Sequence, residues 1–121
     1  MMNKEFDLRK RTKDYALAII NLCSILPNNR QFNVIQNQLL RSGTSVGAQY
    51  REACRAKSDA DMISKFEGAL QELDETDYWL ELLLDLSVNH KQTIEGLRTE
   101  TNELLSIFTA SVRTIKNKKN N

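Results

Sequence analysis

Apolar and polar positions alternate along this chain at intervals of three and four residues. Between residues 8 and 26 the apolar or small positions are Leu8, Tyr15, Ala18, Ile19, Leu22, Cys23 and Leu26. These positions fall on one face of a helix. Pro27 and the two asparagines after it end the pattern. We therefore predict a first helix over about residues 7–26.

The same spacing predicts two further helices. The second stripe consists of Ile35, Leu39, Gly43, Val46, Tyr50 and Ala53, and it predicts a helix over residues 32–57. Ser58 with Asp61 resembles a capping box, and it predicts the start of another helix at residue 59. The third stripe consists of Met62, Phe66, Ala69, Leu73, Thr76, Leu80 and Leu83, and it extends that helix to about residue 87.

After a polar break, a fourth stripe predicts a helix over residues 92–116. It consists of Ile94, Leu97, Thr101, Leu104, Phe108, Ser111 and Ile115. We expect residues 117–121 to form a frayed basic tail. No segment alternates like a strand. Four amphipathic helices with short connections predict an all-α fold, an antiparallel up-and-down four-helix bundle in a single domain of residues 1–121.

Composition narrows the class of protein. The chain is 40% hydrophobic and 27% charged, as in a soluble globular domain. Its apolar runs are too short to span a bilayer, and the N-terminus lacks a signal-peptide stretch. We therefore expect a cytoplasmic protein without a membrane partner. Cys23 and Cys54 are expected to be reduced thiols in that compartment.

The stretch "SGTSVG" could be mistaken for a phosphate-binding loop. A P-loop needs Lys and a hydroxyl after its second glycine, and a strand before the loop, and none of these is present. The apolar stripe runs through Gly43 and Gly47, which places both glycines inside the second helix. Two glycines one turn apart allow another helix to approach closely. We predict close helix packing there, and leave open a contact with a ligand.

The sequence offers no convincing catalytic or metal-binding set. His90, the single histidine, falls in a predicted turn without a partner for a di-metal site or a triad. No Cys and His cluster has zinc spacing. Glu72 and Glu75 could act as acids, but acidic helix faces are usually solvated or ion-paired. We expect no enzyme activity, no cofactor and no small-molecule substrate.

Charge is distributed unevenly along the chain. Residues 1–65 carry a net of +5, residues 66–103 a net of −8 and residues 104–121 a net of +4. The candidates for nucleic-acid binding are Arg9, Lys10, Arg11, Lys13, Arg41, Arg51, Arg55, Lys57, Lys65, Lys116, Lys118 and Lys119. Two alternatives stay open, since basic and acidic helices could also neutralise each other. Arg51 and Arg55 could likewise pair with Asp77 and Glu72 of the third helix.

The third helix has more apolar surface than one stripe requires. Trp79, Leu82 and Leu86 lie beside the main stripe, and Tyr78 falls among polar residues. A wide apolar arc is typical of a helix that touches two neighbours in its own bundle. It is equally typical of a subunit interface, so these four residues are oligomer-interface candidates.

Two stretches resemble a known family. "LLRSGTSVGAQYREACRAKS" (39–58) and "ISKFEGALQELDETDYWLELLLD" (63–85) are similar to the four-helix-bundle family named for 23S rRNA intervening-sequence proteins. "IINLCSILP" (19–27) and "LLSIFTASVRTIK" (104–116) add support. Gln49 departs from the asparagine expected there.

The resemblance implies a bundle that assembles as a homopentamer. Related proteins include the accessory variability determinants of diversity-generating retroelements, which are basic pentamers that associate with RNA and a reverse transcriptase. It brings no catalytic residues with it. The resulting hypothesis is a homo-oligomeric scaffold that binds structured RNA or a reverse-transcriptase-like protein. The alternative is a scaffold that binds proteins alone.

Overall fold

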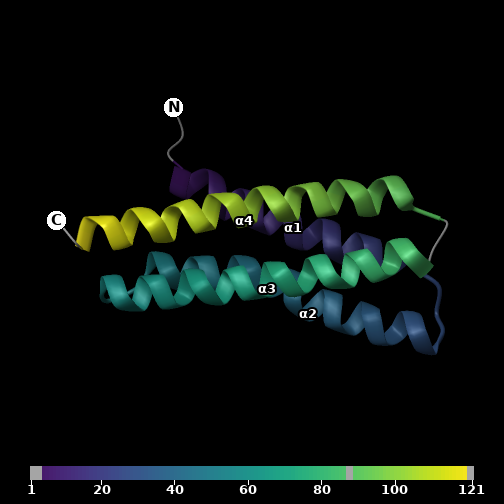
Figure 1. Ribbon diagram of the computed structural model, residues 1–121. Helices are drawn as coiled ribbons and strands as arrows, with labels where there is room; N and C mark the ends of the chain where they lie inside the picture. The colour runs from purple at the N-terminus through teal and green to yellow at the C-terminus, as the bar shows by residue number, and fades with distance from the viewer. Residues whose placement is uncertain (1–3, 87–88, 120–121) are drawn as a thin grey trace.

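The computed structural model describes residues 4–86 and 89–119, with side chains from Leu8 to Lys118 within these ranges. Four helices follow one another: α1 (Lys4–Ile25), α2 (Arg30–Cys54), α3 (Asp59–Leu86) and α4 (Lys91–Lys119). They run alternately up and down, each packs on the next, and α4 returns to α1 (Figure 1). The predicted all-α, up-and-down four-helix bundle is therefore confirmed.

Three predicted helix bounds are each wrong by three residues. The first helix begins at Lys4 and not at residue 7, because no Gly or Pro lies before Leu8 to delay its start. The helix predicted to reach residue 57 ends at Cys54. There the N–H of Arg55 donates to the carbonyl of Glu52, and the N–H of Ala56 donates to that of Ala53, both at 3.1 Å. The helix ends early because residues 55–58 form the turn in which the chain reverses direction between α2 and α3. The helix predicted to end at residue 116 continues to Lys119, because no Gly or Pro interrupts it and lysines favour a helix C-terminus. Residue 87 and residues 120–121 lie outside the described residues.

Side chains cap the starts of α2 and α3. The N–H of Asp61 donates to Ser58 Oγ at 3.1 Å, so the predicted cap is present. Asn29, which the sequence marked only as part of a stop signal, also accepts a bond from the N–H of Phe32 at 3.0 Å. Both turns are therefore fixed to within a residue, and this fixes the register of the helices on either side.

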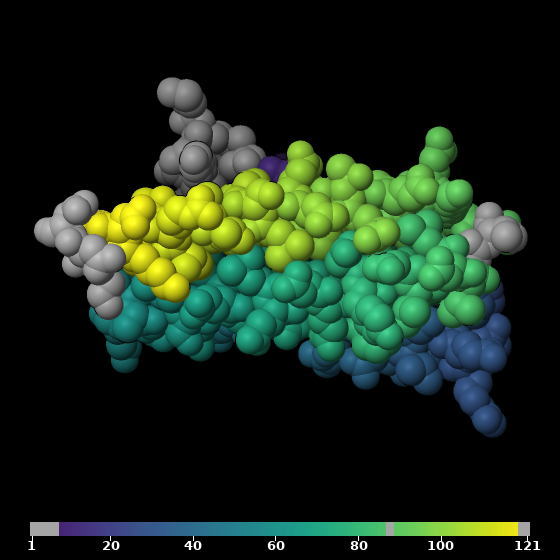
Figure 2. Space-filling model, in the orientation of Figure 1, coloured from purple at the N-terminus to yellow at the C-terminus, as the bar shows by residue number. Residues whose placement is uncertain are grey.

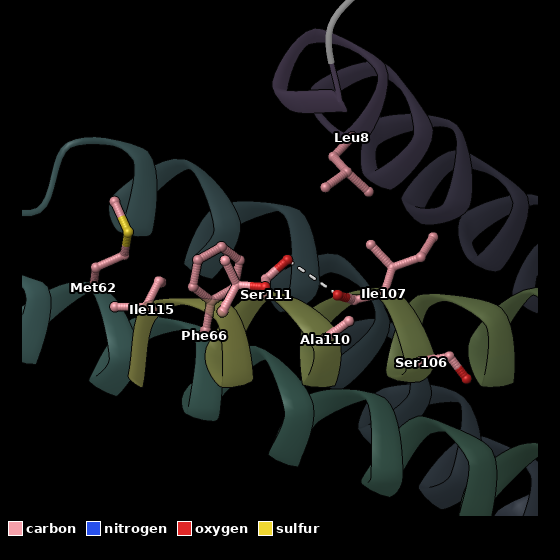
Figure 3. A pocket seen from close by; sticks show the side chains of 9 residues that line it. Leu8, Met62, Phe66, Ser106, Ile107, Ala110, Ser111 and Ile115 are labelled. Atoms are coloured by element: carbon pink, nitrogen blue, oxygen red, sulfur yellow. Dashed lines mark hydrogen bonds between the residues drawn. The ribbon is translucent and has the colours of Figure 1, made fainter. Parts of the chain in front are cut away.

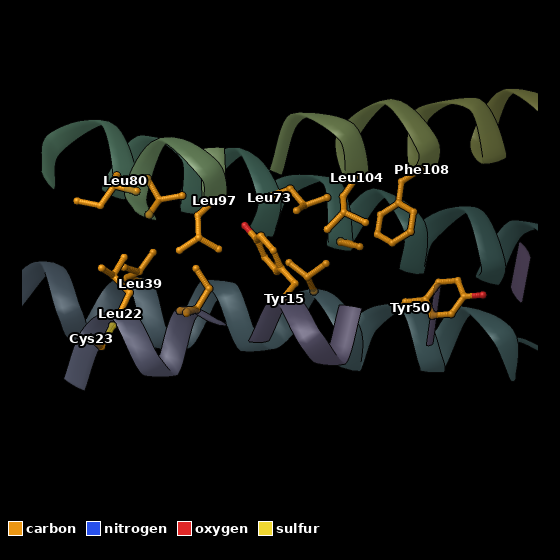
Figure 4. Close-up of a cluster of buried hydrophobic side chains, with 14 of the residues drawn as sticks. Tyr15, Leu22, Cys23, Leu39, Tyr50, Leu73, Leu80, Leu97, Leu104 and Phe108 are labelled. Carbon is orange, nitrogen blue, oxygen red and sulfur yellow. The ribbon is translucent and has the colours of Figure 1, made fainter. Parts of the chain in front are cut away.

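The core is apolar along most of the bundle axis (Figure 4). Its largest fully buried apolar side chains are Ile19, Leu22, Leu39, Val46, Leu73, Leu80, Leu83, Ile94, Leu104 and Phe108. Near the turn between α2 and α3, the ring of Phe108 stacks on Tyr50 at 5.7 Å and meets Phe66 edge-on at 5.5 Å. Each helix contributes to this core, as the four stripes predicted.

A polar layer crosses the middle of the bundle. Tyr15, Ser42, Thr76 and Thr101 contribute one side chain from each helix, and all four are buried. The Tyr15 hydroxyl bonds with Thr101 Oγ1 at 2.6 Å, and Thr76 donates to Ser42 Oγ at 2.7 Å. Burial raises the pKa of Tyr15 well above its ordinary value. The layer favours one register, because a slip would separate the Tyr15 hydroxyl from Thr101 and would leave it buried without that partner.

Gly43 and Gly47 lie where α2 meets α1. A Cβ on Gly43 would come within 2.9 Å of Ile19 Cγ1, and one on Gly47 within 3.1 Å of Thr12 Oγ1. The glycines thus bring α1 close to α2. By contrast, α1 and α4 make the slightest of the four helix contacts. In the view of Figure 2, α3 and α4 form a continuous face.

Candidate nucleic-acid interface

The up-and-down topology gathers charge at the two ends of the bundle. Segments 8–14, 49–68 and 109–118 meet where α2 and α4 end and α3 begins, at the left of Figure 1. They hold eleven Lys and Arg against five Asp and Glu, a net of +6, and we call this the basic end. Segments 15–48 and 69–108 hold four against nine, a net of −5, and form the acidic end.

The carboxylates on the inner side of α3 are paired, and an arginine of the second helix supplies part of the pairing, as expected. That arginine is Arg41, and neither Arg51 nor Arg55 takes part in a described pair. Arg98 Nε donates to Asp77 Oδ1 at 2.9 Å. Arg41 bonds with Glu75, and its Nη1 lies 3.6 Å from Glu72 Oε2. Hydrogen bonding to Asp77 raises the pKa of Arg98.

The hypothesis that Arg51 and Arg55 pair with Asp77 and Glu72 is therefore wrong for the described residues. The physical reason is the register of α2 on α3. Ser42 lies opposite Thr76, next to Asp77. Arg51 is nine residues further along α2, about 13 Å away at 1.5 Å per residue, and it lies at the basic end.

Five of the twelve predicted nucleic-acid-binding residues form ion pairs within the protein. These pairs are Lys10–Asp14, Arg11–Glu100 and Glu103, Arg41–Glu72 and Glu75, Lys65–Glu52, and Lys116–Glu67. The lysine pairs are exposed and worth little, so a phosphate could replace the carboxylate. Arg11 and Arg41 each pair with two carboxylates of a neighbouring helix, so their main role is to join helices.

The other predicted cations behave differently. Among the described residues, no ion pair involves Arg9, Lys13, Arg51, Arg55, Lys57 or Lys118. All six lie at the basic end. The side chain of Lys119 lies outside the described residues. Arg113, which the sequence analysis missed, is exposed in the same part of α4 and shares this property.

Two of these cations, Arg9 and Arg51, lie level with one another across α1 and α2. Gly47 faces Thr12, and the two helices run antiparallel. Arg51 is one turn beyond Gly47, and Arg9 is nearly one turn before Thr12, so the two arginines lie at the same height. Arg55, just after the end of α2, lies one turn beyond Arg51 toward the basic end. Lys13 lies one turn from Arg9 in the opposite direction, so the four cations form a strip along the seam of α1 and α2. We call Arg9, Lys13, Arg51 and Arg55 the basic patch.

The oligomer-interface candidates divide into two pairs. Trp79 and Leu82 are half-buried and pack against the core of their own bundle. Tyr78 and Leu86 are each 54% exposed, so they offer apolar surface to a partner. Four further apolar side chains are exposed, although the apolar spacing did not mark them: Leu17, Ile20, Ile25 and Val34. These four occupy α1 and the start of α2, outside the arc of α3.

Other site types find little support in the described part of the chain. It contains no group of three or more His, Cys, Asp or Glu able to hold a metal ion. Glu72 has a raised pKa because burial disfavours its charge, although Arg41 opposes that effect. Cys23 and Cys54 form no disulfide, and burial raises the pKa of Cys23 to about 11. No described helix is long and apolar enough to cross a membrane.

Fold, core and charge together define a four-helix bundle with one basic end. The chain belongs to the 23S rRNA-intervening sequence protein family, whose model matches residues 4–110. It is also similar to the crystal structure of a protein of unknown function from the S23 ribosomal protein family of Bacteroides thetaiotaomicron. That similarity has 35% identity and a TM-score of 0.84, and covers 92% of this chain and 99% of the other. No curated protein matches the chain.

Proposed function

We propose that this protein is a non-enzymatic, homo-oligomeric scaffold of the cytoplasm that binds structured RNA through its basic patch. The observation that carries the proposal is a strip of four cations, Arg9, Lys13, Arg51 and Arg55, along α1 and the C-terminal end of α2. None of them forms an ion pair with a described carboxylate. A polyanion would supply the charge that the protein itself does not.

The spacing of the patch suits a phosphate backbone. On each helix, the two cations are four residues apart and project about 6 Å from each other. Arginine donates two parallel hydrogen bonds to one phosphate, so Arg9 and Arg51 would fix the register of the backbone. No aromatic side chain belongs to the patch. We therefore expect recognition of RNA shape and charge, with little preference for sequence.

The direct experiment is an RNA-binding titration at several salt concentrations. We expect the logarithm of affinity to fall linearly with the logarithm of salt. The double variant Arg51→Gln/Arg55→Gln should reduce that slope by about 2 and weaken binding on the order of tenfold. Arg30→Gln/Lys91→Gln is the matched control, because it removes two exposed cations from the acidic end. RNA binding that is undetectable at 50 mM salt would rule the proposal out.

A second candidate is a scaffold that binds proteins alone. The exposed apolar side chains Leu17, Ile20 and Val34 favour it, because surface of this kind commonly contacts protein. Purification of partners from a nuclease-treated lysate separates the two candidates. A partner that survives nuclease and is kept by Arg51→Gln/Arg55→Gln supports protein binding. A partner released by nuclease supports RNA as the link.

We further propose a homo-oligomer, with a pentamer favoured by the family resemblance. The exposed Tyr78 and Leu86 support an apolar contact between copies on α3. Light scattering is the test, and Leu86→Lys should lower the mass of the assembly. A monomeric mass for the unaltered protein at micromolar concentration would refute this part. A reverse-transcriptase-like protein, the other partner expected from the resemblance, is tested by copurification before and after nuclease treatment.

A further inference from the structure

The interior of the bundle is open at the basic end. A cavity of about 680 Å³ lies between α1, α3 and α4 (Figure 3). Its apolar walls are Leu8, Met62, Phe66, Ile107 and Ile115. A smaller hollow of about 290 Å³ shares Leu8, Met62 and Phe66 and continues to Tyr50, Ala53 and Cys54 of α2. The two hollows share part of their lining, and together they receive side chains from all four helices.

The sequence explains why the larger hollow exists. The apolar stripe of α4 continues from Phe108 to Ser111, a small residue at a position that large side chains hold elsewhere. Ala110 and Ser106 line the mouth and are small as well. On the other side, Gly43 and Gly47 bring α1 toward α2, and the contact of α1 with α4 is slight. Small residues on α4 and the close approach of α1 to α2 leave this space.

The lining selects the chemistry of a ligand. The Ser111 hydroxyl already donates to the carbonyl of Ile107 at 3.0 Å, so an apolar ligand would leave it satisfied. Met62 has a flexible side chain that adapts to irregular shapes. A volume of about 680 Å³ lies within the range of small-molecule sites, and such sites commonly form between the helices of a bundle.

The charge around the mouth of the cavity favours a negatively charged head group on the ligand. Lys118 lies one turn beyond Thr114, which lines the cavity, so it projects from the same face of α4. It has no described ion-pair partner, and the surrounding end of the bundle has a net charge of +6. Asp59 and Asp61 occupy the first turn of α3 nearby. A negative head group is favoured over a positive one despite these two carboxylates, because cations outnumber them.

We propose that this cavity binds a single aliphatic chain with a carboxylate head group, as in a fatty acid. The chain lies against Leu8, Phe66 and Ile107, and the carboxylate meets Lys118 at the mouth. A partner helix is a poorer fit, since its diameter of about 10 Å would keep it above the floor formed by Phe66. This site is separate from the basic patch, so it does not depend on RNA binding.

The test uses 11-(dansylamino)undecanoic acid as a fluorescent probe, displaced by dodecanoate or by dodecanol below their aggregation limits. We expect saturable binding of one probe per chain, with dodecanoate displacing it several-fold better than dodecanol. Ser111→Phe fills the cavity and should weaken binding at least tenfold. Thr93→Phe is the control, because it adds the same ring on the exposed surface at the start of α4.

Two further measurements guard against a Ser111→Phe variant that does not fold: thermal unfolding, and probe binding by two lysine variants. Thermal unfolding establishes that Ser111→Phe is folded. Should it fail to fold, Lys118→Gln carries the test, since it should abolish the preference for dodecanoate while Lys91→Gln keeps it. The proposal is overturned if no saturable binding occurs, or if folded Ser111→Phe binds the probe as well as the unaltered protein. It is equally overturned if Ser111→Phe dissociates an oligomer, because a second copy would then cover the cavity.

Discussion

The two ends of this bundle use charge in opposite ways. At the acidic end, Asp77 and Glu75 are held by arginines of neighbouring helices, and their charge serves helix packing. At the basic end, Arg51 and Arg55 have no described carboxylate partner, and the interior opens into a cavity. A chain with a net charge of only +1 can thus fold into a bundle with one basic end and one acidic end. The topology, and not the composition, decides which charged residues lie together.

The largest expected effect comes from reversing the basic patch. Changing its four cations to Glu should lower RNA affinity by about 100-fold or more, because four phosphate contacts are lost and repulsion is added. The melting temperature should change little, since these side chains make no described ion pair. Arg41→Gln/Arg98→Gln should do the reverse, with about 1–2 kcal/mol lost in stability and RNA affinity kept within about twofold.

RNA affinity and stability should both be measured on both variants, because the two ends are expected to affect different quantities. A loss of RNA affinity in Arg41→Gln/Arg98→Gln with unchanged folding would show that the acidic-end arginines also contact RNA. Filter binding and thermal unfolding are sufficient for these measurements.

A smaller effect is expected from adding a methyl group to the glycines. Gly43→Ala should destabilise the protein by about 1–2 kcal/mol, because the new Cβ meets fully buried Ile19, and overpacking outweighs the gain in helix propensity. Gly96→Ala is the matched control, since nothing lies within 4 Å of its Cβ position. It should stabilise by about 0.5–1 kcal/mol. Urea unfolding measures both, and equal effects would contradict the close approach of α1 to α2.

The polar layer between the ends should contribute less. Tyr15→Phe removes the hydroxyl that bonds with Thr101, and should cost about 1 kcal/mol of unfolding free energy. Thr101 keeps its bond to the carbonyl of Leu97, which limits the loss. Tyr78→Phe, at an exposed position, should change stability by less than about 0.5 kcal/mol. An unchanged stability for Tyr15→Phe would mean that the layer does not favour one register.

The smallest effect concerns Glu72 at the acidic end. Burial raises its pKa in the folded protein, so the folded state binds the proton more tightly than the unfolded state. Stability should therefore fall as pH rises from the ordinary glutamate pKa through the raised one. Glu72→Gln should remove this fall, whereas Asp74→Asn, at an exposed neighbouring position, should keep it. Unfolding curves across the acidic range provide the check, and a fall that persists in Glu72→Gln would contradict the assignment.

The sequence predicted helix number and core faces, because apolar spacing depends on burial alone. It did not predict which arginine meets which carboxylate, although the signal was present. With α2 and α3 antiparallel about a turn near residues 55–58, Glu75 must lie opposite about residue 38, and hence within one turn of Arg41. Counting from the next turn places Arg98 beside Asp77 in the same way.

Other features of the site could not be read from the sequence. The cavity depends on how far α1 lies from α4, and that distance follows from the packing of α1 on α2. Ser111 gave a partial signal, since a small residue interrupts an apolar stripe there. Tyr78 is exposed and its neighbour Trp79 is half-buried. When the apolar arc of a helix is wide, spacing alone does not tell which residue at its border is buried.

Whether the basic patch contacts RNA is best determined by ultraviolet crosslinking of bound structured RNA, with mass spectrometry of the crosslinked peptides. The basic patch predicts crosslinks within residues 8–14 and 49–57, and their loss in Arg51→Gln/Arg55→Gln. Crosslinks concentrated within residues 69–86, at the acidic end, would contradict the account.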